Sequence, residues 1–233
     1  MDLQELYTKR KGEELFALYD DGDFDAGLFA AKLVFNDAYK APIPEGMKKK
    51  EAKDKLKKDA EDCIVKGAEN NHLACLTEAA DMHFSTRVTP GPFGSTVVFA
   101  NYKQAKTWYL SLLDRDDIDA ELRCLSNFRV GLLTKLIGGK ENTDWQEVIK
   151  YWQAAQESAV KGSELAISAL AMHYFDNKNY EAAVPLLESI YLEAPYTALT
   201  LALCYKNGLG VEINIDKSKE LNDFWAEKIG KAK

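Results

Sequence analysis

One short stretch decides the fold and recurs along the second half of the chain: Asn101-Tyr102-x-x-Ala105-x-x-Trp108, Asp144-Trp145-x-x-Val148-x-x-Tyr151, Asn179-Tyr180-x-x-Ala183-x-x-Leu186 and Asn214-Ile215-x-x-Ser218-x-x-Leu221. Asp144, Asn179 and Asn214 are separated by equal intervals of 35 residues. A constant period of this size is typical of a helical repeat array. In such an array each helical hairpin covers its apolar face only by stacking on its neighbours. The period therefore predicts stacked pairs of helices.

The residue types in this stretch explain why a helix starts there. A short polar side chain at the first position can accept hydrogen bonds from the unpaired amides of the first helical turn, so we expect N-caps at Asn101, Asp144, Asn179 and Asn214. The small residue four positions later lets a neighbouring helix approach closely. The aromatic residue or leucine three positions further on fills the groove one turn away. One face of each of these second helices is therefore predicted to be buried.

A first helix is predicted upstream of each second helix. The clearest signatures are Leu170-Ala171-x-x-Tyr174 and Leu201-Ala202-x-x-Tyr205, with equivalent segments at Leu73 to Phe84 and Ala120 to Val130. An earlier hairpin pairs Phe24 to Tyr39 with Lys50 to Lys66. We therefore expect an all-α fold of about four to five antiparallel hairpins in one domain over residues 1–233. The expected boundaries are 2–20 for a leading helix and 24–66, 70–114, 119–160, 163–190 and 195–230 for the hairpins.

Composition excludes several classes of protein. The chain has 233 residues, 46% hydrophobic and 29% charged, which suits a packed domain rather than a disordered or fibrous chain. The net charge of −7 argues against nucleic acid as a partner, because phosphates require a basic surface. No apolar run approaches the ~20 residues that cross a bilayer, and the first residues lack the pattern of a secretory signal. We therefore expect a cytoplasmic protein with no membrane partner.

The residues that carry chemistry in other proteins are poorly placed for it here. Cys63, Cys75, Cys124 and Cys204 form no C-x-x-C pair and lie in apolar helical patterns, so we interpret them as buried free thiols. The acidic run Asp21-x-Asp23-x-Asp25 has Ala26 where a calcium-binding loop needs glycine. The three histidines have no zinc-ligand spacing, and no nucleophile elbow or P-loop occurs. We predict no catalytic residues, no metal site and no cofactor.

The run Lys48 to Lys58 is the one basic patch of the sequence. Seven lysines oppose two acidic residues there, while Leu56 and Ala60 keep helical spacing. The lysines are therefore interpreted as the solvated face of an amphipathic helix. Binding to nucleic acid or to an anionic membrane would favour arginine and aromatic residues on the same face, and this stretch has neither.

The stretch from Ala202 to Lys219 resembles the Sel-one-like (SEL-like) repeat, a tetratricopeptide-like helical hairpin. Tyr205 is followed by the turn Gly208-Leu209-Gly210-Val211, and then by Lys217 and Ser218 on the second helix. The segments Tyr102 to Tyr109 and Trp145 to Trp152 are similar to the second helix of the family. The turns of the other repeats depart from the glycine pattern. The resemblance covers most of residues 70–233 and implies a right-handed α-solenoid that acts as a protein-binding scaffold, usually without catalysis.

Two regions are expected to contact a partner. Residues 85–100 form a long irregular insertion whose Phe93 and Phe99 are too apolar to remain free in water, so they contact either the core or a partner. By analogy with tetratricopeptide-like stacks, the first helices line a concave face. Positions beside the conserved small residue would point into that face, and these are Thr77, Asp81, Arg123, Asn127, Ser168, Met172, Leu203 and Lys206.

Three functional hypotheses follow from the sequence. The first is a non-enzymatic adaptor that binds another protein through the concave face and the insertion. The second is a cytoplasmic immunity protein or inhibitor that occludes the active site of a toxin or enzyme. The third is an enzyme, which would require shifted carboxylates or a Cys–His pair converging in the groove. An apolar outer surface around Phe224 and Trp225 either closes the core or packs on a second copy, so we expect a monomer or a weak homodimer.

Overall fold

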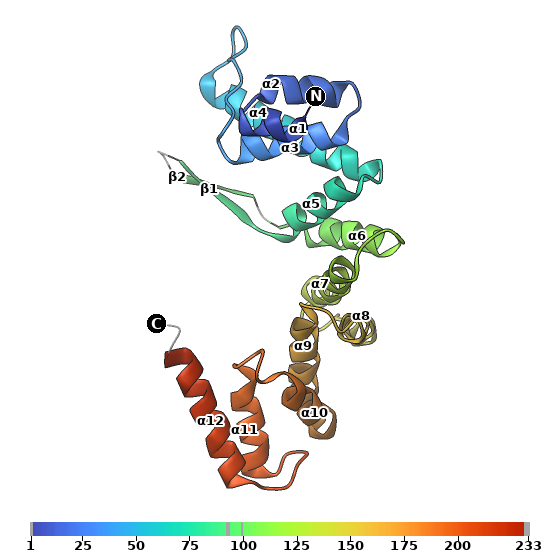
Figure 1. Cartoon of the computed structure of the whole chain (residues 1–233), viewed down its shortest axis with the longest axis vertical. Helices are drawn as coiled ribbons and strands as arrows, with labels where there is room; N and C mark the ends of the chain where they lie inside the picture. The colour runs from blue at the N-terminus through green and yellow to red at the C-terminus, as the bar shows by residue number, and fades with distance from the viewer. Residues whose placement is uncertain (1, 92–93, 99, 231–233) are drawn as a thin grey trace. The chain divides into compact units, whose positions relative to one another are not determined.

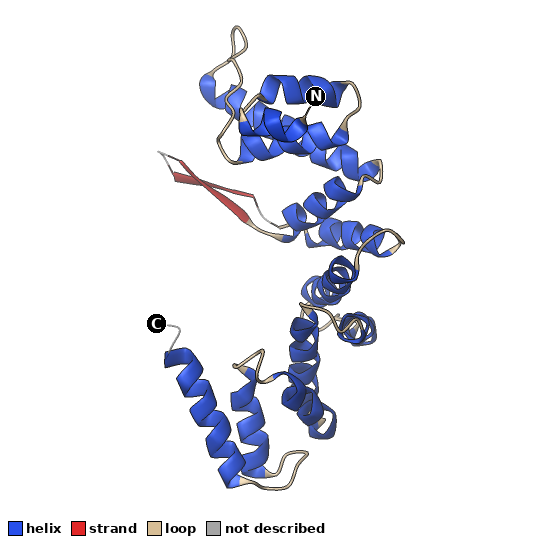
Figure 2. Ribbon diagram, viewed as in Figure 1, coloured by secondary structure: helices blue, strands red, loops and turns tan. Residues whose placement is uncertain are grey.

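The computed structural model describes residues 2–91, 94–98 and 100–230. These residues form helices joined by short turns, together with one β-hairpin (Figures 1 and 2). The chain divides into two compact units, Met1–Arg115 (unit 1) and Asp116–Lys233 (unit 2). The boundary lies in the polar link between two helical hairpins. The contacts of a repeat array are mostly between neighbours, and each unit has its own apolar core.

Unit 1 is built from helices α1 to α6 and the hairpin β1–β2 (Figure 1). Helices α1 and α2 pack on α3, α3 packs on α4, α4 on α5, and α5 on α6. The bounds of these elements are α1 Leu3–Thr8, α2 Gly12–Asp20, α3 Phe24–Phe35, α4 Lys49–Glu69, α5 Leu73–Phe84, β1 Arg87–Gly91, β2 Gly94–Val98 and α6 Tyr102–Leu113.

The expected leading helix over residues 2–20 is wrong, because α1 and α2 are separated by a break at Arg10. Arg10 has the left-handed φ of 58°, and Lys11 N–H donates to the Leu6 carbonyl across the break (2.9 Å). Leu6 and Leu15 are both buried in one apolar cluster with residues of α3. In a continuous helix these two leucines would lie about half a turn apart, on opposite faces. The break therefore lets both side chains reach the same core.

The insertion between α5 and α6 also differs from the all-α expectation. Strands β1 and β2 pair antiparallel in a register that runs from Arg87 opposite Val98 to Gly91 opposite Gly94. The β-branched run Thr96-Val97-Val98 favours an extended backbone, which explains why the hairpin forms there. Phe93 and Phe99, two predicted partner contacts, lie outside the described residues.

Unit 2 contains helices α7 to α12, each packed on the next along the chain (Figure 1). Helix α7 also contacts α9, so the first helices of these two pairs meet directly. The bounds are α7 Ala120–Gly138, α8 Trp145–Glu157, α9 Ser163–Asp176, α10 Tyr180–Ile190, α11 Thr197–Asn207 and α12 Ile215–Gly230. Within the described part of the chain, every helix is too short or too polar to cross a membrane.

The repeated stretch behaves largely as its residue types predict. The side chains of Asn101, Asp144 and Asn214 each accept a hydrogen bond from the backbone amide three residues later. Asn179 is the N-cap residue of α10 as predicted, but its side chain makes no such hydrogen bond. The residues four positions after these caps are buried in every copy: Ala105, Val148, Ala183 and Ser218. The helices therefore approach one another at these positions.

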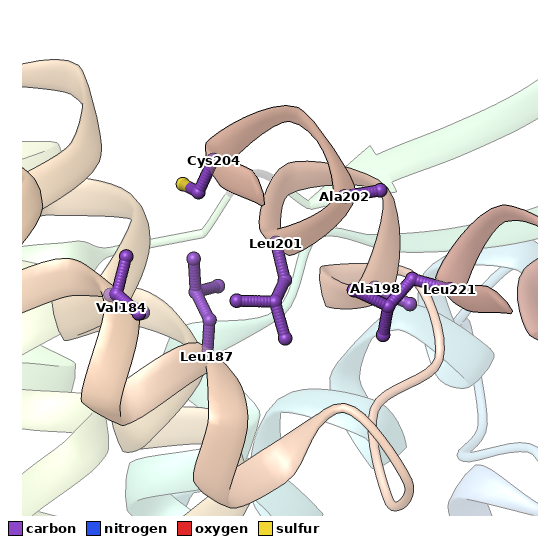
Figure 3. Close-up of a cluster of buried hydrophobic side chains, with 8 residues drawn as sticks. Val184, Leu187, Ala198, Leu201, Ala202, Cys204 and Leu221 are labelled. Atoms are coloured by element: carbon purple, nitrogen blue, oxygen red, sulfur yellow. The ribbon is translucent and has the colours of Figure 1, made fainter. Parts of the chain in front are cut away.

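Two apolar clusters form the core of unit 2. One joins α7, α8 and α9 around Trp152 and Leu170. The other joins α9, α10, α11 and α12 around Leu187, Leu201 and Leu221 (Figure 3). Leu186 packs against both clusters, so they form one continuous seam. Phe224 and Trp225 pack against the second cluster, where they cover the last hairpin of the chain.

The cysteines are buried and free, as predicted from their apolar surroundings. Burial raises the pKa of Cys63 to about 12 and the pKa values of Cys75 and Cys204 to about 11. These three thiols are therefore protonated at neutral pH and are poor nucleophiles.

Candidate functional site

The two predicted contact residues of α5 are held by hydrogen bonds within unit 1. The Thr77 hydroxyl donates to the Leu73 carbonyl one turn earlier (3.0 Å). Asp81 accepts a hydrogen bond from the hydroxyl of the buried Tyr109 on α6. Asp81 therefore ties α5 to α6, and its role as a partner contact stays a prediction.

The predicted contact residues of unit 2 lie on α7, α9 and α11, which are the first helices of its pairs. On α7, Arg123 and Asn127 are half-buried one turn apart, and the Asn127 amide donates to the Arg123 carbonyl (3.0 Å). On α9, Met172 is half-buried and its sulfur accepts from the Thr200 hydroxyl of α11 (3.7 Å). That contact links α9 to α11.

The sequence predicted Ser168 to lie on the contact surface, and this prediction is wrong. Its side chain is buried, with 5% of the residue exposed, and its hydroxyl has no partner among the described residues. Ser168 precedes the buried Ala171 by three residues, so both lie on the same inward face of α9. The outward face carries Leu165, Ala169 and Met172 instead, at the i, i+4, i+7 spacing of one helical stripe.

The outward stripe of α11 contains the two predicted residues of that helix. Leu203 is 43% exposed, Lys206 is exposed, and Leu199, which the sequence argument omitted, is 36% exposed. These three residues again follow i, i+4, i+7 spacing. Leu165 and Leu199 were not among the predicted contact residues, because exposed and buried leucines look alike in a sequence.

A groove runs between α7 and α9. It contains two depressions, of about 310 Å³ and 460 Å³, and Phe128 lines both. Leu125 and Leu132 of α7 face Leu165, Ala169 and Met172 of α9 along it. We call this groove, together with the outward stripe of α11, the first-helix face. Asp119, Glu121, Lys161 and Glu164 border one end of it.

The other end of the groove is aromatic. The His173 ring stacks on Trp145 with 4.3 Å between ring centroids. The Lys135 ammonium lies 5.5 Å from the Trp145 ring centroid and 6.0 Å from that of Trp152, at cation–π distance. The Trp152 indole N–H donates to the Phe128 backbone carbonyl (3.3 Å), which fixes the indole ring against α7.

The charge state of His173 follows from this packing. Burial lowers the pKa of His173 below its ordinary value of 6.5, and the positive charge of Lys135 lowers the pKa further. The imidazole is therefore neutral at pH 7. Because the unfolded chain binds this proton more readily, the contribution of His173 to stability is complete above pH 6.5 and is lost as the pH falls.

We predict that Lys135→Gln raises the pKa of His173 toward its ordinary value, because it removes the nearby positive charge. The measurement is an NMR titration of the imidazole C–H resonances. Lys150→Gln is the matched control, since Lys150 packs over Tyr151 and does not affect His173. An unchanged His173 midpoint in Lys135→Gln would show that the Lys135 ammonium does not lie over the aromatic end of the groove in solution.

One Cys–His pair resembles a catalytic arrangement and lies in unit 1. His72 Nδ1 is 3.2 Å from Cys75 Sγ, and His72 Nε2 is 3.5 Å from a carboxylate oxygen of Asp25. Cys75 is fully buried, however, and a methyl group on Gly67 would lie only 2.4 Å from its sulfur. A substrate has no room to reach this thiol. The pair therefore joins the start of α5 to α3 and α4, and we assign it a structural role.

No group of three or more His, Cys, Asp or Glu side chains that could hold a metal ion occurs among the residues that the structure describes. The first-helix face is an apolar groove with charged residues at its ends, which is a shape suited to binding.

Comparison with solved structures identifies the fold. The chain superposes on the crystal structure of a Sel1 repeat protein from Oxalobacter formigenes with a TM-score of 0.57 and 17% sequence identity, over 98% of this chain and 59% of that one. It also matches a protective antigen of uropathogenic Escherichia coli strains with an SLR fold, at a TM-score of 0.45 and 16% identity, over 93% of this chain and 48% of that one. This chain thus spans about three fifths of the length of the first structure and half of the second.

No protein-family model and no curated protein matches the sequence. The structural likeness nevertheless confirms the predicted α-solenoid, and the arrangement of helices is that of Sel1-like repeats. The glycine turn of the last repeat and the recurring small residues were sufficient to predict it.

Proposed function

We propose that this chain, which has the Sel1-like repeat fold, is a non-enzymatic cytoplasmic adaptor that binds a protein partner along the first-helix face of unit 2. Sel1-like repeat folds generally serve as protein-interaction modules. The proposed binding surface includes Leu203 and Lys206, which were predicted from the sequence, and also Leu165 and Leu199. Ser168 is not part of this surface, because it is buried.

The observation that carries the proposal is the exposed apolar stripe on successive first helices. Leu165 is 44% exposed, Leu203 43% and Leu199 36%, although each belongs to a regular helix with an available buried face. Exposed leucines scattered singly are ordinary, but a contiguous apolar patch rimmed by polar residues is typical of a protein-binding surface. Here Leu165 lines the groove together with Phe128, and Leu199 and Leu203 lie on α11 beside Thr200, whose hydroxyl contacts the sulfur of Met172.

The groove also supplies anchors of the kind that dominate binding energy. Phe128, Met172 and Trp145 present aromatic and thioether surface in a depression, where water is easily displaced. Asp119 and Glu121 at one end and Lys135 at the other would orient a segment of the partner that lies along the groove. An amphipathic helix or an extended peptide with apolar side chains fits this description.

An inhibitor of a toxin or an enzyme would use the same surface, so the identity of the captured partner distinguishes the two roles.

We predict that Leu165→Glu and Leu203→Glu each weaken capture of the partner at least about tenfold, because each buries a charge in an apolar contact. Leu192→Glu is the matched control: Leu192 is 59% exposed but follows α10, outside the first-helix face. The measurement is quantitative affinity capture from native lysate, with circular dichroism to confirm folding.

Loss of capture in the Leu192→Glu variant to the same extent would contradict the assignment of the surface. Unchanged capture by both Leu165→Glu and Leu203→Glu would contradict it as well.

A further inference from the structure

A second groove lies in unit 1, away from any predicted contact residue. It has a volume of about 420 Å³ and is formed by the end of α3, the connection over residues 36–48 and the first half of α4. Its apolar lining includes Val34, Tyr39, Ile43 and Leu56. Lys40, Lys49, Lys53, Lys57 and Asp37 surround this lining. We call it the lysine-rimmed groove.

The wall of this groove is fixed by packing at the start of the connection. The backbone amides of Ala38 and Tyr39 both donate to the Leu33 carbonyl (2.8 and 3.2 Å), so the chain turns back immediately after α3. The Tyr39 ring then lies against Gly12 of α2, where an added methyl group would be 2.4 Å from the ring. These hydrogen bonds and the packing of Tyr39 on α2 therefore hold this wall of the groove in place.

The lysines converge on one place. Lys49, Lys53 and Lys57 follow i, i+4, i+8 spacing, so they form one stripe along α4, and Lys40 approaches from the connection. Lys53 Nζ lies 3.0 Å from the Asp37 carboxylate. Lys53 holds the pKa of Asp37 below its usual range, and Lys57 and Lys40 lower that pKa further. All three ammonium groups therefore act on the same carboxylate.

The groove has an excess of positive charge in an acidic chain. Four lysines face one aspartate there, whereas the whole chain carries a net charge of −7. The single ion pair is exposed, with side-chain exposures of 55% for Lys53 and 62% for Asp37, so it contributes little to stability. The remaining lysines are available to an anionic ligand. Ile43, 51% exposed, adds apolar surface beside them.

We propose that the lysine-rimmed groove binds an acidic peptide segment of a protein partner, in which apolar side chains alternate with glutamate or aspartate. The apolar side chains would occupy the lining beside Ile43 and Leu56, while the carboxylates would pair with Lys49, Lys53, Lys57 and Lys40. This site is independent of the first-helix face, and its test stands apart from that of the proposed function.

The same observations disfavour other anionic partners. Nucleic acid binds most often through arginine and stacking aromatic rings, and the groove offers lysines with Tyr39 as its one aromatic residue. A bilayer surface would contact a convex or flat basic patch, whereas these lysines surround a depression. An acidic peptide can place individual side chains into the depression, so it matches both the shape and the charge of the groove.

The test is a fluorescence anisotropy titration of the full chain with a labelled peptide that alternates glutamate with leucine and phenylalanine. We expect the triple variant Lys49→Glu, Lys53→Glu and Lys57→Glu to weaken binding about 30-fold, because three favourable charge pairs become repulsive. The matched control is Lys50→Glu, Lys55→Glu and Lys58→Glu, which makes the same charge change on lysines of α4 outside the groove. This control is expected to weaken binding less than about threefold.

A second variant tests the apolar lining. Ile43→Ser, at a largely exposed position that leaves the fold intact, is expected to weaken binding about fivefold. Equal loss in the two lysine triples, or equal affinity for a peptide with serine in place of leucine and phenylalanine, would overturn the proposal. Tighter binding to an anionic vesicle or to a single-stranded oligonucleotide, lost in the Lys49, Lys53 and Lys57 triple, would assign the surface to that ligand and would also overturn it.

Discussion

Trp152→Ala is expected to lower the free energy of unfolding by about 3–5 kcal/mol, because it deletes a tryptophan side chain that is almost fully buried. Trp152 has 2% of its surface exposed and lies at the centre of the cluster that joins α7, α8 and α9. Its ring packs against Gly131 of α7, where an added methyl group would be 2.6 Å away. The neighbouring helices cannot fill the resulting cavity without losing their other contacts.

The measurement is chemical denaturation of the full chain followed by circular dichroism. Tyr196→Ala, which removes a 56% exposed aromatic ring of the same unit, is the control and is expected to change stability by less than about 0.5 kcal/mol. A loss below about 1 kcal/mol for Trp152→Ala would mean that α7, α8 and α9 do not share one packed seam in solution.

Gly210→Ala is expected to destabilise unit 2 by about 2–4 kcal/mol, for two reasons that add. Gly210 has a left-handed φ of 70°, which an L-residue adopts with strain. An added methyl group would also lie 2.6 Å from the carbonyl carbon and oxygen of Tyr180 and 2.9 Å from the amide nitrogen of Glu181. These are backbone atoms at the start of α10, so no change of rotamer can relieve the contact.

Gly208→Ala is the matched comparison, because Gly208 lies in the same turn with nearly the same φ of 69°. Its added methyl group would meet the side chain of Ile213 at 3.0 Å, and Ile213 is 66% exposed and free to move. We expect a cost of about 1 kcal/mol, from the backbone strain alone. Thermal unfolding of both variants measures the difference. Equal costs, or a larger cost for Gly208→Ala, would contradict the close approach of the turn to α10.

The two glycines show how far sequence reasoning reaches. The sequence places Gly208 and Gly210 in a turn after Tyr205, and Gly208 indeed ends α11 there with a left-handed backbone. The contact of Gly210 with Tyr180 was not predicted, because it comes from the preceding hairpin. A contact between hairpins depends on how they stack, which the local sequence does not specify. The same reason explains why the groove between α7 and α9 was not predicted.

Other differences have equally local causes. The break at Arg10 follows from the need to bury Leu6 and Leu15 in one cluster, and this competes with the helical pattern of residues 2–20. Ser168 was assigned to the contact surface because the register was taken from an analogy, whereas its three-residue distance from the buried Ala171 places it inside. The buried positions Ala105, Val148 and Ala183 were predicted correctly, because small residues there meet the requirement for close helix packing.

The most direct test of the first-helix face is photo-cross-linking from defined positions of the full chain. A photoreactive phenylalanine analogue at Leu165 or Leu203 is expected to cross-link the captured protein partner, because both side chains point outward from first helices of unit 2. The same analogue at Leu192 is expected to give no cross-link to that partner. Cross-linking from Leu192 with none from Leu165 and Leu203 would place the partner elsewhere and would contradict the proposed binding surface.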